Sequence, residues 1–230
     1  MKTKLLFLLS LLWIMPVYGG VIAHRGLWQA GYPQNSIAGV EAALKSQYDG
    51  FEIDIRQTSD GILILNHDDT IGDNKVALTP YQELFIDDVA PALLTDMLEL
   101  CKMFPAKTIF AEIKSGNAND IWGAFENAGV TSNVIFQSFD PTICREMMAL
   151  TDSPVWLLSA DPDLDFPYLQ KEGFTGVSLM YVEGVTEGAF IDLIHSMGLK
   201  VAFWTVNDAA TAEQLQMWGA DYVITDLSSL

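Results

Sequence analysis

Short apolar runs alternate with amphipathic stretches along most of the chain. The runs are rich in β-branched residues and predict strands at Val21–His24, Phe51–Ile55, Ile62–Asn66, Thr108–Ile113, Val134–Gln137, Val155–Leu158, Gly176–Leu179, Val201–Thr205 and Tyr222–Thr225. Helical spacing of apolar residues lies between most of them, at Ser36–Lys45, Leu93–Met103, Pro141–Ala149, Glu187–Met197 and Ala209–Trp218. Strands that alternate with helices pair in parallel through crossover helices, so the pattern predicts an α/β fold.

The predicted strands number one more than a closed (β/α)8 TIM barrel needs. Ile62–Asn66 follows Phe51–Ile55 with no room for a helix, and Asp60-Gly61 between them is typical of a two-residue type I′ turn. We therefore expect an antiparallel β-hairpin after the second barrel strand, with a register that places His67 opposite Asp54. The stretch from 66 to 91 has no clear periodicity and predicts a short insertion on the barrel rim. No linker divides the chain, so we expect a single domain.

The first nineteen residues have the order of a secretory signal peptide. Lys2 and Lys4 precede an apolar run over residues 5–17, and small residues follow at Gly19 and Gly20. The run is short for a membrane span, although an uncleaved anchor is the alternative. We expect a signal segment at 1–19, a barrel domain at 20–230, and a mature protein that is periplasmic or secreted without stable membrane insertion.

The charge balance narrows the classes of partner. The sequence contains thirty Asp and Glu and twelve Lys and Arg, which gives a formal net charge of −18. Phosphate neutralisation along a nucleic acid needs a basic face, so the acidic balance argues against nucleic-acid binding and leaves a metal cation or a compact ligand. Cys101 and Cys144 fall on predicted helices and are expected to be free thiols, with a disulfide as the alternative.

Polar residues occupy the predicted carboxyl ends of three strands, where a parallel barrel builds its active site. They are His24 and Arg25, then Glu52 and Asp54, then Glu112 and Lys114. Three carboxylates on adjacent strands form a hard oxygen site that suits Ca²⁺ or Mg²⁺. The alternative is an ion-pair network in which Arg25 and Lys114 compensate the carboxylates.

Eight segments, in order along the chain, resemble the glycerophosphodiester phosphodiesterase family. They are Ile22–Gly26, Pro33–Ser36, Gly50–Asp54, Ser59–Gly61 with His67-Asp68, Glu112–Lys114, Gln137–Asp140, Trp204–Asp208 and Gly219–Asp226. The resemblance spans nearly the whole chain after the signal segment. It implies a (β/α)8 barrel that hydrolyses a small-molecule glycerophosphodiester to sn-glycerol 3-phosphate and an alcohol with one divalent cation.

The resemblance also implies roles for individual residues. It assigns metal binding to Glu52, Asp54 and Glu112, acid and base catalysis to His24 and His67, and phosphate binding to Arg25 and Lys114. Trp204 is expected to form part of the substrate pocket, as is Asn35 from the Pro33–Ser36 segment. Gln34 and Ser36 stand where the family usually has Glu and Thr.

Two other functions and several secondary residues stay open at this point. The alternatives are a phospholipase-D-like enzyme that acts on intact lipid and a catalytically silent barrel that binds phosphodiesters. Trp28, Tyr32 and Phe139 are candidates for the pocket rim, and His195 is expected on the surface. Asp226 follows the last strand and is interpreted as a helix cap. The pattern does not predict an oligomeric state.

Overall fold

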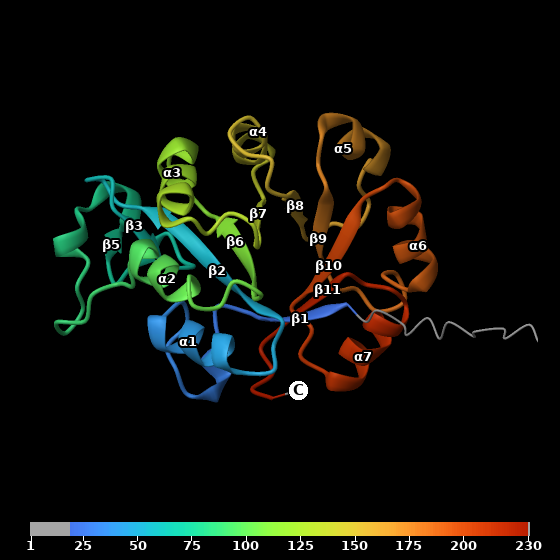
Figure 1. The fold of residues 1–230 in the computed structure, drawn as a ribbon, viewed down its shortest axis with the longest axis horizontal. Helices are drawn as coiled ribbons and strands as arrows, with labels where there is room; N and C mark the ends of the chain where they lie inside the picture. The colour runs from blue at the N-terminus through green and yellow to red at the C-terminus, as the bar shows by residue number, and fades with distance from the viewer. Residues whose placement is uncertain (1–18, 230) are drawn as a thin grey trace, which may run out of the picture.

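Eight parallel strands form a closed barrel in the computed structural model, which describes residues 19–229. In chain order the strands are β1 (Gly20–Ala23), β2 (Gly50–Gln57), β6 (Thr108–Ile113), β7 (Val134–Ser138), β8 (Val155–Ser159), β9 (Gly176–Met180), β10 (Lys200–Trp204) and β11 (Tyr222–Thr225). Because β1 pairs in parallel with both β2 and β11, the first and last strands close the ring. The predicted TIM barrel is confirmed (Figure 1). The predicted signal segment lies outside the described residues, apart from Gly19.

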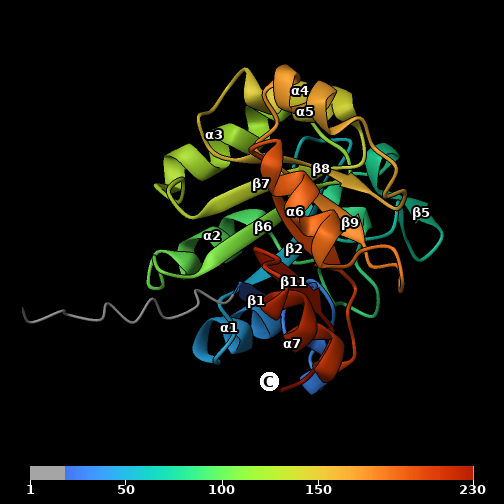
Figure 2. The ribbon, with the colours of Figure 1, turned by 90° about the vertical axis from the view of Figure 1, so that its right-hand side faces the viewer.

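Seven α-helices cover the outside of the barrel (Figures 1 and 2). They are α1 (Ile37–Lys45), α2 (Leu94–Cys101), α3 (Ala118–Ala128), α4 (Pro141–Met148), α5 (Phe166–Glu172), α6 (Gly188–Ser196) and α7 (Ala209–Met217). All five helices that were predicted by residue range are present. The other two begin at polar N-caps, where Asn117 and Asp165 accept hydrogen bonds from backbone N–H groups of the first turn.

The hairpin after β2 exists, but its predicted turn and register are wrong. Strand β3 (Leu63–Leu65) pairs antiparallel with β2 in a register that sets Ile55 opposite Leu65. The loop has three residues rather than two, because Thr58 pairs with Ile62 and only Gly61 of the loop has a positive φ, 86°. A three-residue loop needs one left-handed residue, whereas type I′ needs two. The shift by one residue places Asn66, not His67, opposite Asp54; the Asn66 N–H donates to the Asp54 carbonyl at 2.9 Å.

His67 still reaches the barrel mouth, because the chain leaves the sheet after Leu65. The guanidinium of Arg56 donates to the His67 carbonyl from Nε at 3.1 Å and from Nη2 at 2.6 Å. The predicted rim insertion then follows, with a small ribbon of β4 (Thr70–Ile71) and β5 (Asn74–Lys75) and 3-10 turns at Val76–Leu78 and Tyr81–Glu83. In Figure 1 it lies at the left edge, beyond the hairpin.

The apolar core of the barrel has two layers separated by the strands, and a third small cluster of Ile64, Val76 and Leu84 lies under the rim insertion. The larger layer lies between the strands and the helices, and the smaller one fills the inside of the barrel. The inner layer consists of Ile22, Phe110, Ile135, Trp156, Ala202 and Ile224. Since side chains alternate faces along a strand, this layer fixes which residues further along each strand also point inward.

The two cysteines are buried free thiols, as expected. Burial raises the pKa of Cys101 and of Cys144 to about 12, so neither is a reactive thiolate at neutral pH. Within residues 19–229, no helix combines the length and the apolar character that a membrane crossing requires.

Candidate active site

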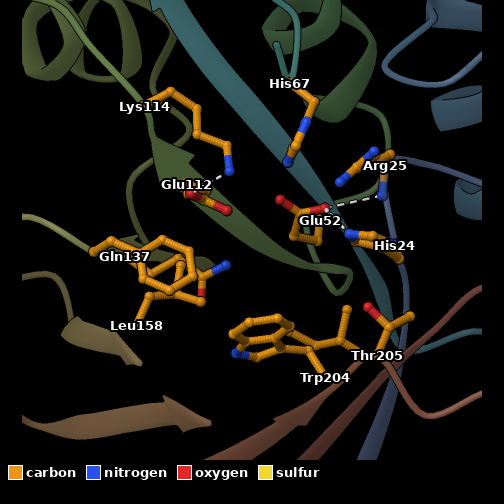
Figure 3. A pocket seen from close by; sticks show the side chains of 12 residues that line it. His24, Arg25, Glu52, His67, Glu112, Lys114, Gln137, Leu158, Trp204 and Thr205 are labelled. Carbon is orange, nitrogen blue, oxygen red and sulfur yellow. Dashed lines mark hydrogen bonds and ion pairs between the residues drawn. The ribbon is translucent and has the colours of Figure 1, made fainter. Parts of the chain in front are cut away.

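The inner apolar layer is followed, two residues along each strand, by the residues at the barrel mouth. The inner-layer residues and their successors are Ile22 and His24, Phe110 and Glu112, Ile135 and Gln137, Trp156 and Leu158, Ala202 and Trp204, and Ile224 and Asp226. Five of these successors line a cavity of about 140 Å³ at the carboxyl ends of the strands, together with Arg25, Glu52, His67 and Lys114 (Figure 3). The strand period of two residues therefore assembles the site from distant parts of the sequence.

Three buried carboxylates cluster on β2 and β6. Each of Glu52, Asp54 and Glu112 offers an oxygen, and these oxygens lie within 4.8 Å of one another. Burial, followed by repulsion from Asp54, raises the pKa of Glu52 well above its ordinary value and that of Glu112 to about 7. Glu52 Oε1 and Asp54 Oδ1 are buried without a hydrogen-bond partner in the described part of the chain. Buried carboxylate oxygens without a hydrogen-bond donor are hard ligands that fit a divalent cation.

Two cationic side chains compensate part of this charge. Lys114 Nζ lies 2.6 Å from Glu112 Oε1 and 3.4 Å from Asp54 Oδ1, and Arg25 Nε lies 3.4 Å from Asp54 Oδ2. The ion-pair network that the sequence left open therefore exists. It supplies two positive charges to three carboxylates, so it leaves one negative charge that a cation can compensate.

Asn35 lies behind the carboxylate cluster rather than in the cavity wall. Its side-chain amide donates to Asp54 Oδ2 at 2.8 Å, and its Oδ1 accepts from the Asp54 backbone N–H at 3.0 Å. Asn35 is buried and is not among the residues that line the cavity, contrary to its predicted place in the substrate pocket. Its neighbour Gln34 accepts a hydrogen bond from Arg25 Nη1 at 2.8 Å, and Ser36 caps helix α1.

After β1 the backbone makes a left-handed turn that points the Arg25 N–H at the carboxylate cluster. Arg25 has φ of 53° and Gly26 has φ of 74°. This conformation allows the Arg25 N–H to donate to Glu52 Oε2 at 2.9 Å. A Cβ at Gly26 would lie 2.9 Å from the Gly39 carbonyl carbon in α1, so both the φ angle and the close approach require glycine. The strained Arg25 is held at the site by its contacts to Glu52, Gln34 and Asp54.

His24 is held by a carboxylate that the sequence analysis interpreted differently. Its Nδ1 lies 2.8 Å from Asp226 Oδ1, and its Nε2 lies 3.9 Å from Glu52 Oε2. Trp28 Nε1 and Asn207 Nδ2 donate to Asp226 at 2.8 and 3.0 Å. Burial alone would raise the pKa of Asp226, but these hydrogen bonds outweigh it and lower the pKa. The interpretation of Asp226 as a helix cap is wrong, since no helix follows it in the described chain.

His67 has a similar arrangement on the other side of the cavity mouth. Its Nδ1 lies 2.8 Å from Asp68 Oδ1, and Figure 3 shows its ring directed towards Glu52. The hydrogen bond from His67 lowers the pKa of Asp68, which therefore remains ionised beside the ring. Each histidine is thus held through Nδ1 by an aspartate, which leaves Nε2 for chemistry in the cavity.

The remaining side of the cavity is formed by uncharged side chains. Trp204 and Phe139 pack edge to face with ring centroids 5.7 Å apart, and Lys114 Nζ lies 5.7 Å from the Phe139 ring. The predicted positions of Trp204 and Phe139 at the pocket are thereby reproduced. Trp28 contacts Asp226 instead of the cavity, and Tyr32 is not among the residues that line it.

Sequence reasoning missed Gln137, Leu158 and Asp226 as residues of the site or its support. All three follow an inner-layer residue by two positions, as His24 and Glu112 do. Counting two residues on from the inward-facing apolar residue of each strand identifies them. The missing information was which face of each strand points inward.

Removing the carboxylate that holds His24 should impair catalysis more than folding. We expect Asp226→Asn to lower kcat at least about 10-fold, because the amide holds the imidazole in a less suitable protonation and orientation. The measurement is steady-state kinetics together with a thermal melt. Asp221→Asn is the matched control, because Asp221 also pairs with a histidine, His195 Nε2 at 2.9 Å, and lies away from the cavity. Equal kcat values for Asp226→Asn and wild type would contradict the role.

The raised pKa of Glu112 predicts a pH dependence of stability in chelator-treated protein. The folded protein binds the Glu112 proton more tightly than the unfolded chain does, whose Glu has the ordinary value near 4.5. The contribution of Glu112 to the free energy of unfolding is therefore complete below about pH 4.5 and is lost as the pH rises through about 7. We expect the free energy of unfolding, measured with urea in EDTA, to fall between pH 5 and 8. Glu112→Gln should flatten this fall; an unchanged slope would contradict the assignment.

The carboxyl end of this parallel barrel brings together three carboxylates, two cationic side chains and two histidines that each pair with an aspartate. This combination is that of a (β/α)8-barrel hydrolase. The sequence matches the glycerophosphoryl diester phosphodiesterase family over residues 24–92 and 96–229. The chain therefore belongs to this family and is a phosphodiesterase that hydrolyses glycerophosphodiesters.

Individual relatives agree along the whole barrel. A glycerophosphodiester phosphodiesterase from Caldanaerobacter subterraneus is 25% identical over 229 residues, which cover 90% of this chain and 93% of the relative. The crystal structure of a glycerophosphodiester phosphodiesterase from Parabacteroides distasonis has a TM-score of 0.83 and 26% identity, with 92% of this chain and 94% of the other covered. A phosphodiesterase structure from Oleispira antarctica, at 20% identity and a TM-score of 0.74, shares the fold over 91% of this chain and 93% of the other.

Proposed function

We propose that the cavity binds a glycerophosphodiester and that cleavage gives sn-glycerol 3-phosphate and an alcohol. The observation that carries this proposal is the position of two acid-paired histidines around one buried carboxylate cluster. His24 and His67 both line the cavity that Glu52 and Glu112 line. The Oleispira antarctica phosphodiesterase, whose fold is similar, is described in complex with its product sn-glycerol-3-phosphate.

The charged half of the cavity would bind the phosphoryl group. A phosphodiester carries one negative charge, and attack at phosphorus moves charge onto its non-bridging oxygens. Arg25 and Lys114 line the cavity and would stabilise that charge from fixed positions. Glu52, Asp54 and Glu112 would hold one Ca²⁺ or Mg²⁺, which supplies further positive charge to the phosphoryl oxygens when bound.

The two histidines would carry the protons. The attacking hydroxyl must lose a proton, and the leaving alkoxide must gain one. One imidazole accepts at Nε2 and the other donates at Nε2, while Asp226 and Asp68 hold the two rings through Nδ1. His24 Nε2 lies 3.9 Å from Glu52 Oε2, so proton transfer at this atom would take place next to the carboxylate cluster.

The reaction is tested by product release from defined substrates. The chain from Gly20 onward is incubated with glycerophosphocholine or glycerophosphoethanolamine in Ca²⁺, in Mg²⁺ or in EDTA. We expect release of glycerol 3-phosphate in at least one metal and none in EDTA, as an enzymatic assay for glycerol 3-phosphate would detect. Release of phosphocholine instead, or turnover that chelator leaves unchanged, would contradict the proposal.

We further propose that the enzyme is exported and loses its first nineteen residues. The support is the order of Lys2 and Lys4, the apolar run and the glycines at 19 and 20. Expression of the full chain in a bacterial host should give a periplasmic or secreted protein that begins at Gly20, as measured by intact mass. A full-length protein that stays in the membrane fraction would show an uncleaved anchor instead.

A further inference from the structure

The cavity has a charged half and a neutral half. The charged half comes from the ends of β1, β2 and β6, whereas Gln137, Leu158 and Trp204 come from the ends of β7, β8 and β10. Figure 3 shows Gln137 and Leu158 on the side opposite His24 and Arg25. A phosphoryl group held by the cations would therefore extend its uncharged organic part towards Gln137 and Trp204.

Gln137 carries an unused hydrogen-bonding group in this neutral half. Its side chain is buried, with 2% of its surface exposed, and its Oε1 has no hydrogen-bond partner among residues 19–229. Three of the other buried unpaired atoms belong to Arg25, Glu52 and Asp54, which the charged half explains, and three belong to Ser115, Trp156 and Ser178, which do not line the cavity. A buried amide oxygen without a partner is costly to the free enzyme, which indicates that a ligand supplies the partner.

The surroundings of the amide indicate what kind of ligand group this is. Leu158, Phe139 and Trp204 offer apolar contact around Gln137, and Figure 3 shows its amide directed into the cavity. Carbon atoms that carry a hydroxyl group match such a surface, because the carbons pack on the rings while the hydroxyl bonds to the amide. A hydroxyl both donates and accepts, so it satisfies either orientation of the amide.

We propose that Gln137 is the specificity-determining residue that binds the terminal hydroxyl of the glycerol moiety. This inference rests on the proposed function and names the substrate group that the neutral half recognises. The 2-hydroxyl is one carbon nearer to phosphorus and therefore nearer to the histidines and carboxylates. The terminal hydroxyl is the one that can extend across the cavity to β7.

The test compares two substrates that differ only in this hydroxyl. Glycerophosphocholine carries it, whereas propane-1,2-diol 1-phosphocholine lacks it and keeps the neighbouring 2-hydroxyl. A site that binds a hydroxyl discriminates against a substrate without it, so we expect kcat/KM of the wild type to fall about 10- to 100-fold on the deoxy substrate. In Gln137→Met the two substrates should differ by less than about 3-fold, since the thioether is of similar size and offers no comparable hydrogen bond.

Further variants separate recognition from structure. Gln137→Asn retains the amide on a shorter side chain and should keep an intermediate discrimination. Gln170→Met, an exposed position on α5, is the matched control and should behave as wild type. Because Gln137→Met removes an unpaired buried polar group, its melting temperature should be equal to or above that of the wild type. A lower melting temperature with equal losses on both substrates would assign a structural role and overturn the proposal.

A binding measurement keeps this inference apart from the reaction itself. Calorimetry gives the dissociation constants of sn-glycerol 3-phosphate and of propane-1,2-diol 1-phosphate for wild type and Gln137→Met. We expect the wild type, but not the variant, to bind the first ligand at least about 10-fold more tightly. If the wild type releases no glycerol 3-phosphate, the proposed reaction fails, and these constants still decide the role of Gln137. An active wild type without preference for the terminal hydroxyl would overturn the inference alone.

Discussion

His67→Ala is expected to lower kcat by about 10²- to 10⁴-fold, the range that a positioned proton-transfer group contributes. The imidazole lines the cavity, and its Nδ1 is held by Asp68, so the alanine variant loses the group that exchanges a proton at Nε2. The side chain is 37% exposed and lies outside the barrel strands, so folding should be unaffected. Steady-state release of glycerol 3-phosphate measures the loss, and the melting temperature confirms the fold.

The chain provides a closely matched control for this variant. His195 is also 37% exposed and is also paired with an aspartate, since its Nε2 lies 2.9 Å from Asp221 Oδ2. It lies on α6 and does not line the cavity. His195→Ala should therefore retain wild-type kcat. Equal losses of kcat from the two substitutions would show that His67 has no chemical role and that removing a paired histidine lowers kcat by disturbing the structure.

Glu52→Gln is expected to abolish most of the stabilisation that a divalent cation gives to the protein. A ligand present at 100 times its dissociation constant stabilises the folded state by about 2.7 kcal/mol. Replacing one of three clustered carboxylates should weaken cation binding at least about 100-fold, and kcat should fall with it at fixed metal concentration. Thermal melts with Ca²⁺ or Mg²⁺, compared with melts in EDTA, measure the loss.

The same variant should behave differently when metal is withheld. Burial and repulsion by Asp54 and Glu112 raise the pKa of Glu52, which means that its charged form is unfavourable in the folded protein. In EDTA near neutral pH, Glu52→Gln should therefore melt at or above the wild-type temperature. Glu126→Gln, an exposed position on α3, controls for the loss of one charge. A Glu52→Gln protein that keeps the full metal-induced rise in melting temperature would contradict the assignment.

The alternation of apolar strands and amphipathic helices was sufficient to predict the barrel. The pattern succeeded because parallel strands buried on both faces are apolar throughout, and the crossover geometry then leaves few topologies. It failed at the turn after β2, where Asp60-Gly61 is compatible with both a two-residue and a three-residue loop. The hydrogen bond between the Thr58 hydroxyl and Asp60 Oδ1 accompanies the longer loop, and the sequence pattern did not reveal it.

The site was predictable to the extent that its residues lie in short strand-end segments. Glu52, Glu112 and Lys114 were identified from such segments and lie together as expected. The role of Asn35 was not predictable, because its contact with Asp54 depends on how the loop before α1 returns to β2. The pairing of His24 with Asp226 depends on closure between the first and last strands, which no local pattern specifies.

That closure makes enzymatic activity a direct reporter of completed folding. His24 and Asp226 are 202 residues apart in sequence and become neighbours only when β1 pairs with β11. A chain that is still emerging from the ribosome, or that lacks its last strand, has every charged residue of the cavity but no support for His24. During refolding, recovery of turnover should therefore lag behind the return of helical circular dichroism by the time needed to complete the ring.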